Sequence, residues 1–356
     1  MKKIVGIFAA AAVLATSVFA ADVSATAKVK STLFNSKDGA ISLLGTIENN
    51  QTAGHITLFT LSTSSDNAGG TVKYWGDGNK VVFGGYTVWY KPTDALKLSY
   101  KENALELFGD KYNGWYAHNV AGSNAGYGLQ IAADALTFDV VVKDGFMTKA
   151  KDADPVIGQI GAKVSYAADF GSIAAVFSYA GESTTPAVAA KKAWKFNDET
   201  GLYDHDAKND TKAADAVKNP ATIEIGAGFS GNFDAVGVVF NAGAKIAGET
   251  TTVGINPSAG GSIDALGWAL DVPVTLTLAS ETTTALGLNA KASYALDPAK
   301  FTLYFEDANL LADGDFAAKI GCAIEGSVGA ASWKVDPSFD TGKKEFNVAL
   351  ETGISF

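Results

Sequence analysis

The chain has 356 residues, and its 28 lysines, with no arginine, are outnumbered by 38 aspartates and glutamates. This negative balance argues against nucleic acid or another polyanion as a partner, and the single cysteine, Cys322, excludes an intrachain disulfide. Glycine is abundant at 38 residues and proline is scarce at 8, with 20 phenylalanines and 12 tyrosines. Glycine with aromatic and β-branched residues, spread over many short segments, predicts an all-β chain.

The first twenty residues have the pattern of a secretory signal peptide. Lys2 and Lys3 precede an apolar run from Ile4 to Leu14, and small residues surround Ala20. This run and every later one are shorter than the roughly 18 residues of a transmembrane helix. The sequence therefore predicts cleavage after Ala20 and export of residues 21–356. Without the two lysines, the exported chain would carry 26 basic and 38 acidic residues.

Segments in which apolar and polar residues alternate recur along the rest of the chain. They include residues 95–100, 136–143, 160–166, 223–229, 286–294, 301–306, 316–326 and 345–356. A period of two predicts β-strands that separate two unlike environments. Short turns between them largely alternate with long connections, which we place at residues 102–124, 145–155, 182–220 and 247–259.

This arrangement is typical of a transmembrane antiparallel β-barrel with short periplasmic turns and long outer loops. Aromatic residues close several strands just before a short turn, as interfacial girdles do; these are Tyr90, Tyr166, Phe229 and Tyr294. We count about fifteen strands from Lys80 onward and predict 16 to 18 in total, within one domain of residues 21–356. Residues 182–220 are predicted to form a long surface loop. The alternative is a soluble β-sandwich.

The signal peptide, the all-β body and a last strand ending in Phe356 resemble bacterial outer-membrane β-barrels. The resemblance implies contact with outer-membrane lipid, and Phe356 as an assembly signal for the barrel-assembly machinery. More narrowly, "SSDNAGGTVKYWG" (64–76) and "YTVWYKPTDALKLSY" (86–100) are similar to porin-like outer-membrane proteins of spirochaetes. A homotrimer is one assembly that the resemblance allows. Because the chain lacks arginine, the arginine-lined constriction of general porins cannot be carried over.

A barrel of 16 to 18 strands is wide enough for a water-filled channel. The polar series of its strands predicts pore-lining residues, which are Lys97, Lys101, Asp139, Lys143, Lys163, Glu224, Lys245, Lys291, Glu306, Lys319, Glu325 and Glu351. Their signs nearly balance, so the acidity of the chain lies in its loops and turns. Net charge alone therefore does not predict a cation-selective pore.

The connection at residues 101–125 combines charged and apolar side chains. The apolar ones need burial, and an inward fold against the wall would supply it. The sequence then predicts a constriction loop with four charged candidates, which are Glu102, Glu106, Asp110 and Lys111. The alternatives are an outer loop packed on its neighbours and a subunit interface.

The sequence predicts no catalytic residue, cofactor or metal site. The stretch "DHDAKND" (204–210) departs from the EF-hand pattern at Lys208, and Cys322 lies on an apolar series that should face lipid. The predicted function is an outer-membrane porin for passive diffusion of small hydrophilic solutes. A transporter for a specific or hydrophobic substrate, a surface-displayed adhesin or structural barrel, and a soluble secreted β protein remain as alternatives.

Overall fold

The structure is a computed structural model. It describes residues 22–36, 56–77, 80–100, 105–112, 126–143, 147–148, 156–185, 194–197, 202–205, 217–312 and 317–355. No helix in these ranges is long and apolar enough to cross a membrane. The predicted signal peptide and Phe356 lie outside the described residues, so the division into signal peptide and one domain stays a prediction.

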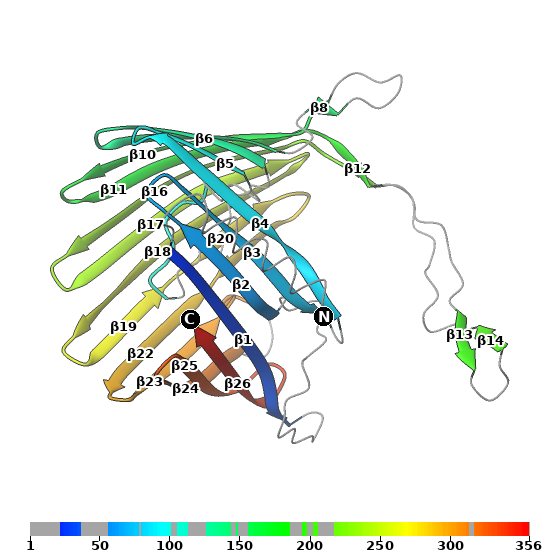
Figure 1. Ribbon diagram of the computed structural model, residues 1–356, viewed down its shortest axis with the longest axis vertical. Coiled ribbons are helices and arrows are strands. Elements are labelled where there is room, and N and C mark those ends of the chain that lie inside the picture. Colours follow the sequence, from blue (N-terminus) through cyan, green and yellow to red (C-terminus); the bar gives the residue numbers. More distant parts are fainter. Residues whose placement is uncertain are drawn as a thin grey trace.

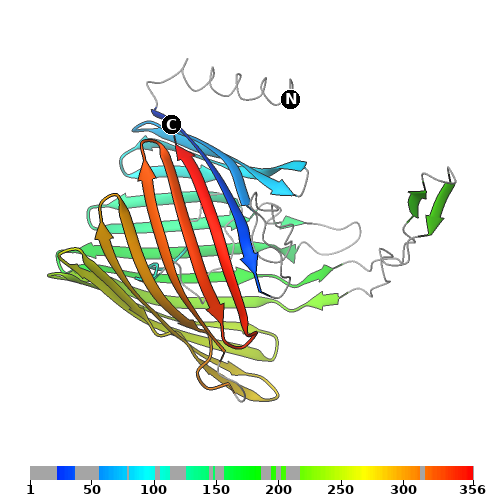
Figure 2. The same ribbon diagram turned by 90° about the horizontal axis from the view of Figure 1, so that it is seen from below.

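Twenty strands form one antiparallel sheet that curves round on itself (Figures 1 and 2). They are β1 (Asp22–Asn35), β2 (Ile56–Ser64), β3 (Ala68–Asp77), β4 (Lys80–Thr93), β5 (Leu96–Tyr100), β6 (Gly126–Ala133), β7 (Leu136–Lys143), β10 (Gln159–Ala168), β11 (Gly171–Ala180), β16 (Thr222–Phe233), β17 (Val236–Ala247), β18 (Thr250–Ile263), β19 (Leu266–Asp271), β20 (Val274–Leu278), β21 (Thr282–Leu286), β22 (Leu288–Leu296), β23 (Ala299–Asp307), β24 (Ala318–Val328), β25 (Ala331–Asp340) and β26 (Glu345–Ser355).

The ladders of this sheet lead back to the strand from which they start. Strand β1 pairs with β2 on one side and with the last strand, β26, on the other. Strands β19 and β20 both pair with β18 and continue one another across Val272 and Pro273, as β21 and β22 do across Gly287. The twenty strands therefore occupy eighteen positions around the described barrel, and the predicted antiparallel β-barrel of 16 to 18 strands is confirmed.

One edge of the barrel carries tight turns. Asp134, Asp234 and Asp264 begin three two-residue connections with φ of 51°, 51° and 53°. Aspartate tolerates this left-handed conformation better than most residues, which explains its recurrence. The register pairs Ile354 with Ala331, so the last strand ends at this edge.

The opposite edge carries the long connections at 101–125, 144–158 and 181–221. The described parts of these connections contain three short ladders: β8 (Met147–Thr148) with β9 (Val156–Ile157), β12 (Ser183–Thr185) with β15 (Val217–Asn219), and β13 (Trp194–Asn197) with β14 (Leu202–His205). Figures 1 and 2 show β13 and β14 apart from the barrel.

The predicted long connection at 247–259 is wrong. Residues 250–263 form β18, which follows β17 after Gly248 and Glu249, and Gly248 takes a φ of 59° that suits a tight turn. One face of β18 carries Gly254, Asn256 and Ser258, whose Cα partners on β17 are Gly243, Asn241 and Val239. Runs of small and polar residues are also typical of loops, and this explains the wrong prediction. In the structure these residues line the interior of the barrel.

The two faces of the sheet reverse the usual distribution of side chains. Large apolar side chains on the outer face are exposed, among them Phe138, Phe177, Phe240 and Leu303, which is 62% exposed. Polar side chains on the inner face are buried, among them Asn241, Asn256 and Ser258. This is the apolar-out, polar-in alternation of a barrel whose outer face meets lipid.

Candidate functional site: the lumen and its inward segment

The described part of the 101–125 connection, residues 105–112, lies along the inner face of the barrel. It begins at Leu105, which is 2% exposed and packs against Val141 of β7 and Val176 of β11. It ends at Tyr112, whose hydroxyl donates to Glu306 Oε1 of β23 at 2.8 Å. The segment therefore crosses the inner wall from β7 to β23.

Backbone hydrogen bonds attach the middle of the segment to the wall. Asn241 Nδ2 of β17 donates to the Phe108 carbonyl at 2.5 Å, and the Lys111 amide donates to Ser258 Oγ of β18 at 2.7 Å. Lys163 Nζ of β10 donates to the Glu106 carbonyl at 2.8 Å. These contacts hold the backbone itself, so the path of the segment does not depend on one side chain.

Glycines on the inner face make room for the segment. Leu105 lies over Gly161 so closely that a Cβ there would collide with its side chain, and a Cβ at Gly228 would collide with Asn241 Oδ1 and come within 3.0 Å of the Phe108 ring. The Lys111 side chain covers Gly237 in the same way. The glycine-rich polar series of these strands therefore matches the path of the inward segment.

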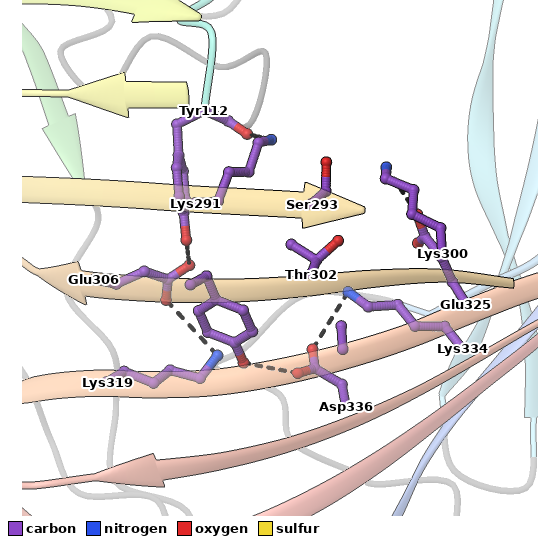
Figure 3. Close-up of a pocket in the computed structure, with 12 residues that line it drawn as sticks. Tyr112, Lys291, Ser293, Lys300, Thr302, Glu306, Lys319, Glu325, Lys334 and Asp336 are labelled. Atoms are coloured by element: carbon purple, nitrogen blue, oxygen red, sulfur yellow. Dashed lines mark hydrogen bonds and ion pairs between the residues drawn. The ribbon is translucent and has the colours of Figure 1, made fainter. Parts of the chain in front are cut away.

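Beyond Tyr112 the wall of β22 to β25 carries lysines, carboxylates and tyrosines around a cavity of about 380 Å³ (Figure 3). Its lining residues are Tyr112, Lys291, Ser293, Lys300, Thr302, Tyr304, Glu306, Lys319, Ala323, Glu325, Lys334 and Asp336. The segment thus forms one boundary of the cavity, and the strands form the other.

Ion pairs and hydrogen bonds link these side chains across adjacent strands. Three ammonium groups each meet a carboxylate: Lys300 with Glu325 at 3.0 Å, Lys319 with Glu306 at 3.7 Å, and Lys334 with Asp336 at 3.3 Å. Tyr304 donates its hydroxyl to Asp336 Oδ1 at 2.7 Å. The wall therefore presents alternating charges that are already neutralised in pairs.

Tyr112 joins the segment to this wall through two groups. Its hydroxyl donates to Glu306, and its carbonyl accepts a hydrogen bond from the Lys291 ammonium (Figure 3). Burial, and then the contact with the Glu306 carboxylate, raise the pKa of the Tyr112 phenol well above its ordinary value. The phenol therefore stays a neutral donor at physiological pH.

The other predicted pore-lining residues form smaller groups on the inner face. Asp139 is 4% exposed, accepts from Gln130 Nε2 at 2.7 Å and pairs in register with Lys163. Glu224 is buried and meets Lys245 at 3.2 Å.

Further round the wall, Lys97 lies over the Trp89 ring at 5.2 Å, and Glu351 pairs in register with Lys334. Lys101, Glu102 and Phe356, and the side chain of Lys143, lie outside the described residues.

The four predicted constriction residues differ in their exposure, and one of them is not described. Glu106 is exposed, Asp110 is buried at 5% exposure and Lys111 is partly buried, all on the inward segment. Glu102 is the one outside the described residues. The segment therefore brings three of the four predicted charges to the inner face.

Sequence reasoning missed Lys300, Lys334, Asp336, Tyr304 and Tyr112. The first three follow the same alternation as the predicted residues, in "AKFTLYFE" and "WKVDPSFD", and could have been found there. Tyr304 could not have been found in this way, because the alternation rule assigns only polar residues to the inner face and Tyr304 is aromatic. Tyr112 gains its place only from the path of the segment.

No family model and no curated protein sequence matches this chain. Solved bacterial outer-membrane proteins share its fold. OprD of Pseudomonas aeruginosa is 8% identical with a TM-score of 0.51, and the match covers 95% of each chain. The trimer form of OmpT, an outer membrane protein of Vibrio cholerae, is 9% identical with a TM-score of 0.50, over 94% of this chain and 99% of that one.

Proposed function

We propose that this chain is an outer-membrane porin through which small hydrophilic solutes diffuse without catalysis, and that the segment Leu105–Tyr112 narrows its lumen. The observation that carries the proposal is the eighteen-position barrel with an apolar outer face, a polar inner face and a segment attached along the inner wall. A barrel of this size exceeds the eight strands whose interior side chains fill.

The location follows from the physics of the two faces. A bilayer offers no hydrogen bonds to backbone groups, so strands can cross it only in a sheet without edges. The ladder between β1 and β26 removes the edge, and exposed apolar residues such as Phe177 and Leu303 suit acyl chains. We infer contact with outer-membrane lipid, insertion by the barrel-assembly machinery through the last strand, and the homotrimer as the assembly to test.

Passage would follow the charged wall of β22 to β25. The segment covers the inner face near β10 to β18, whereas the cavity beside Tyr304 remains lined by polar groups. The polar groups there would let a solute pass without losing its hydration. Because the charges are paired, they would bind neither cations nor anions tightly.

Planar-bilayer recording of the refolded chain tests this function. The expected result is stepwise conductance from protein that migrates differently on a gel before and after heating, as folded barrels do. Folded protein that gives no conductance steps would overturn the proposal.

A transporter for a specific substrate is the second candidate, favoured by the cavity of about 380 Å³ between the segment and the wall. It predicts a silent bilayer together with saturable uptake of one solute class into vesicles. A passive porin predicts uptake that rises linearly with solute concentration.

A further inference from the structure

The carboxylates around the cavity of β22 to β25 are largely occupied by their neighbours. Both oxygens of Glu306 are engaged, Oε1 by the Tyr112 hydroxyl and Oε2 by the Lys319 ammonium. Both oxygens of Asp336 are engaged in the same way, by a tyrosine hydroxyl at 2.7 Å and a lysine ammonium at 3.3 Å. A cation that entered the cavity would therefore find few free acceptor atoms.

The hydrogen-bond donors of the same cavity are not used up. An ammonium group carries three N–H donors, and Lys300 and Lys334 each meet one carboxylate. Lys291 forms no ion pair with a carboxylate among the described residues, and its ammonium donates to a backbone carbonyl of the inward segment instead. The hydroxyls of Ser293 and Thr302 have no hydrogen-bond partner in the part of the chain that the structure describes.

These five side chains share one part of the wall. Ser293 of β22 pairs in register with Thr302 of β23. Lys291 and Lys300 each lie one position further along the same face, in opposite directions from that pair, and Lys334 lies two strands from Lys300 at the same level. Figure 3 shows the two hydroxyls between Lys291 on one side and the other two lysines on the other.

The charges of this part of the wall do not cancel completely. The Lys291 ammonium is close enough to interact electrostatically with those of Lys300 and Lys334, and also with the carboxylates of Asp110 and Glu325. Over the whole lining of the cavity, four lysines outnumber three carboxylates. Like charges that are held together repel one another, and an anion between them would relieve that repulsion.

We propose that Lys291, Lys300, Lys334, Ser293 and Thr302 form a weak binding site for small oxyanions, the oxyanion patch, and that the channel therefore favours anionic solutes. Ammonium and hydroxyl groups donate to the oxygens of such an ion, and a lysine binds phosphate as a point charge. Binding stays weak because the carboxylates of the ion pairs offset part of the positive charge. The preference for anionic solutes rests on the proposed porin function, whereas binding itself is measured without any conductance.

Phosphorus NMR of inorganic phosphate tests the oxyanion patch, with the refolded full-length chain in a detergent that contains no phosphate. We expect folded wild-type protein to broaden the phosphate signal in a saturable way. Lys291→Gln should raise the phosphate concentration at half-saturation about fivefold. Thr302→Val keeps the shape of the side chain without its hydroxyl and should raise that concentration about threefold. A role of Thr302 in packing alone predicts no change, because valine fills the same space.

The matched control is Lys245→Gln, which removes a lysine charge from β17, away from the oxyanion patch, and should leave phosphate binding unchanged. Heat-dependent gel migration shows which variants are folded, and if Lys291→Gln fails to fold, Thr302→Val decides between the outcomes.

Folded wild-type protein that does not broaden the phosphate signal overturns the oxyanion patch. Equal weakening in Lys245→Gln also overturns it, because it would mean general attraction to lumenal lysines. Saturable phosphate binding by a protein that gives no conductance steps supports the patch and overturns the porin function alone, so the two failures are distinguishable.

Discussion

The inner wall of the barrel has two unlike regions. Strands β7 to β18 present glycine, valine and amide side chains that are covered by the segment Leu105–Tyr112. Strands β22 to β25 present paired lysines and carboxylates around an open cavity. One lumen can therefore contain a packed region and a solvated region. Small residues on β7 to β18 leave room for the segment to pack against the wall, whereas the long charged residues on β22 to β25 line an open, polar space.

Removing the apolar anchor should have the largest effect. Leu105→Ala deletes a buried contact with Val141 and Val176, and such deletions cost about 2–5 kcal/mol. The Leu105 end of the segment should then detach from the wall, while the hydrogen bonds of Phe108, Lys111 and Tyr112 hold the rest and the barrel persists. Single-channel recording should show a larger and noisier conductance than wild type.

The control is Leu303→Ala, which shortens an exposed side chain on the outer face and should leave conductance unchanged. If Leu105→Ala keeps wild-type conductance, the segment does not narrow the lumen.

Loosening the other end of the segment should matter less. Tyr112→Phe removes a hydrogen bond to a carboxylate, worth about 1.5–3 kcal/mol. Conductance should flicker more often between levels without losing its main step. Tyr294→Phe, on the exposed outer face, is the comparison and should behave as wild type.

High pH should reproduce that change in the wild type. Because the Tyr112 pKa is raised in the folded chain, its contribution is intact below pH ~10, the unfolded value, and declines above it. Flicker in wild type should therefore stay constant up to pH ~10 and increase at higher pH, relative to Tyr112→Phe, which lacks the phenol. An equal response of both proteins would assign the effect to other groups.

Changing charge on the open wall should affect selectivity with little effect on stability. Lys300 and Lys334 are partly exposed, and ion pairs of this kind contribute about 0–1 kcal/mol. The double variant Lys300→Gln, Lys334→Gln should shift the reversal potential in a salt gradient toward cations. Lys343→Gln, an exposed lysine at the long-loop edge, should leave it unchanged.

Much of the wall was predictable because alternation reports which environment each side chain meets. That rule placed Lys291, Glu306, Lys319 and Glu325 on one polar series, and the structure gathers all four around the cavity. The alternation rule failed where the segment Leu105–Tyr112, and not solvent, covers the inner wall. There the inner series becomes glycine and asparagine, as in β18, and the contrast between the faces disappears.

The sequence by itself determined the β-barrel and the facing of its strands, because a bilayer outside and water inside impose a period of two on each strand. It also indicated that residues 101–125 need a place for their apolar side chains. Only the tertiary structure decided where that place is, since Leu105, Asn241, Ser258 and Glu306 come together through pairing of strands distant in sequence.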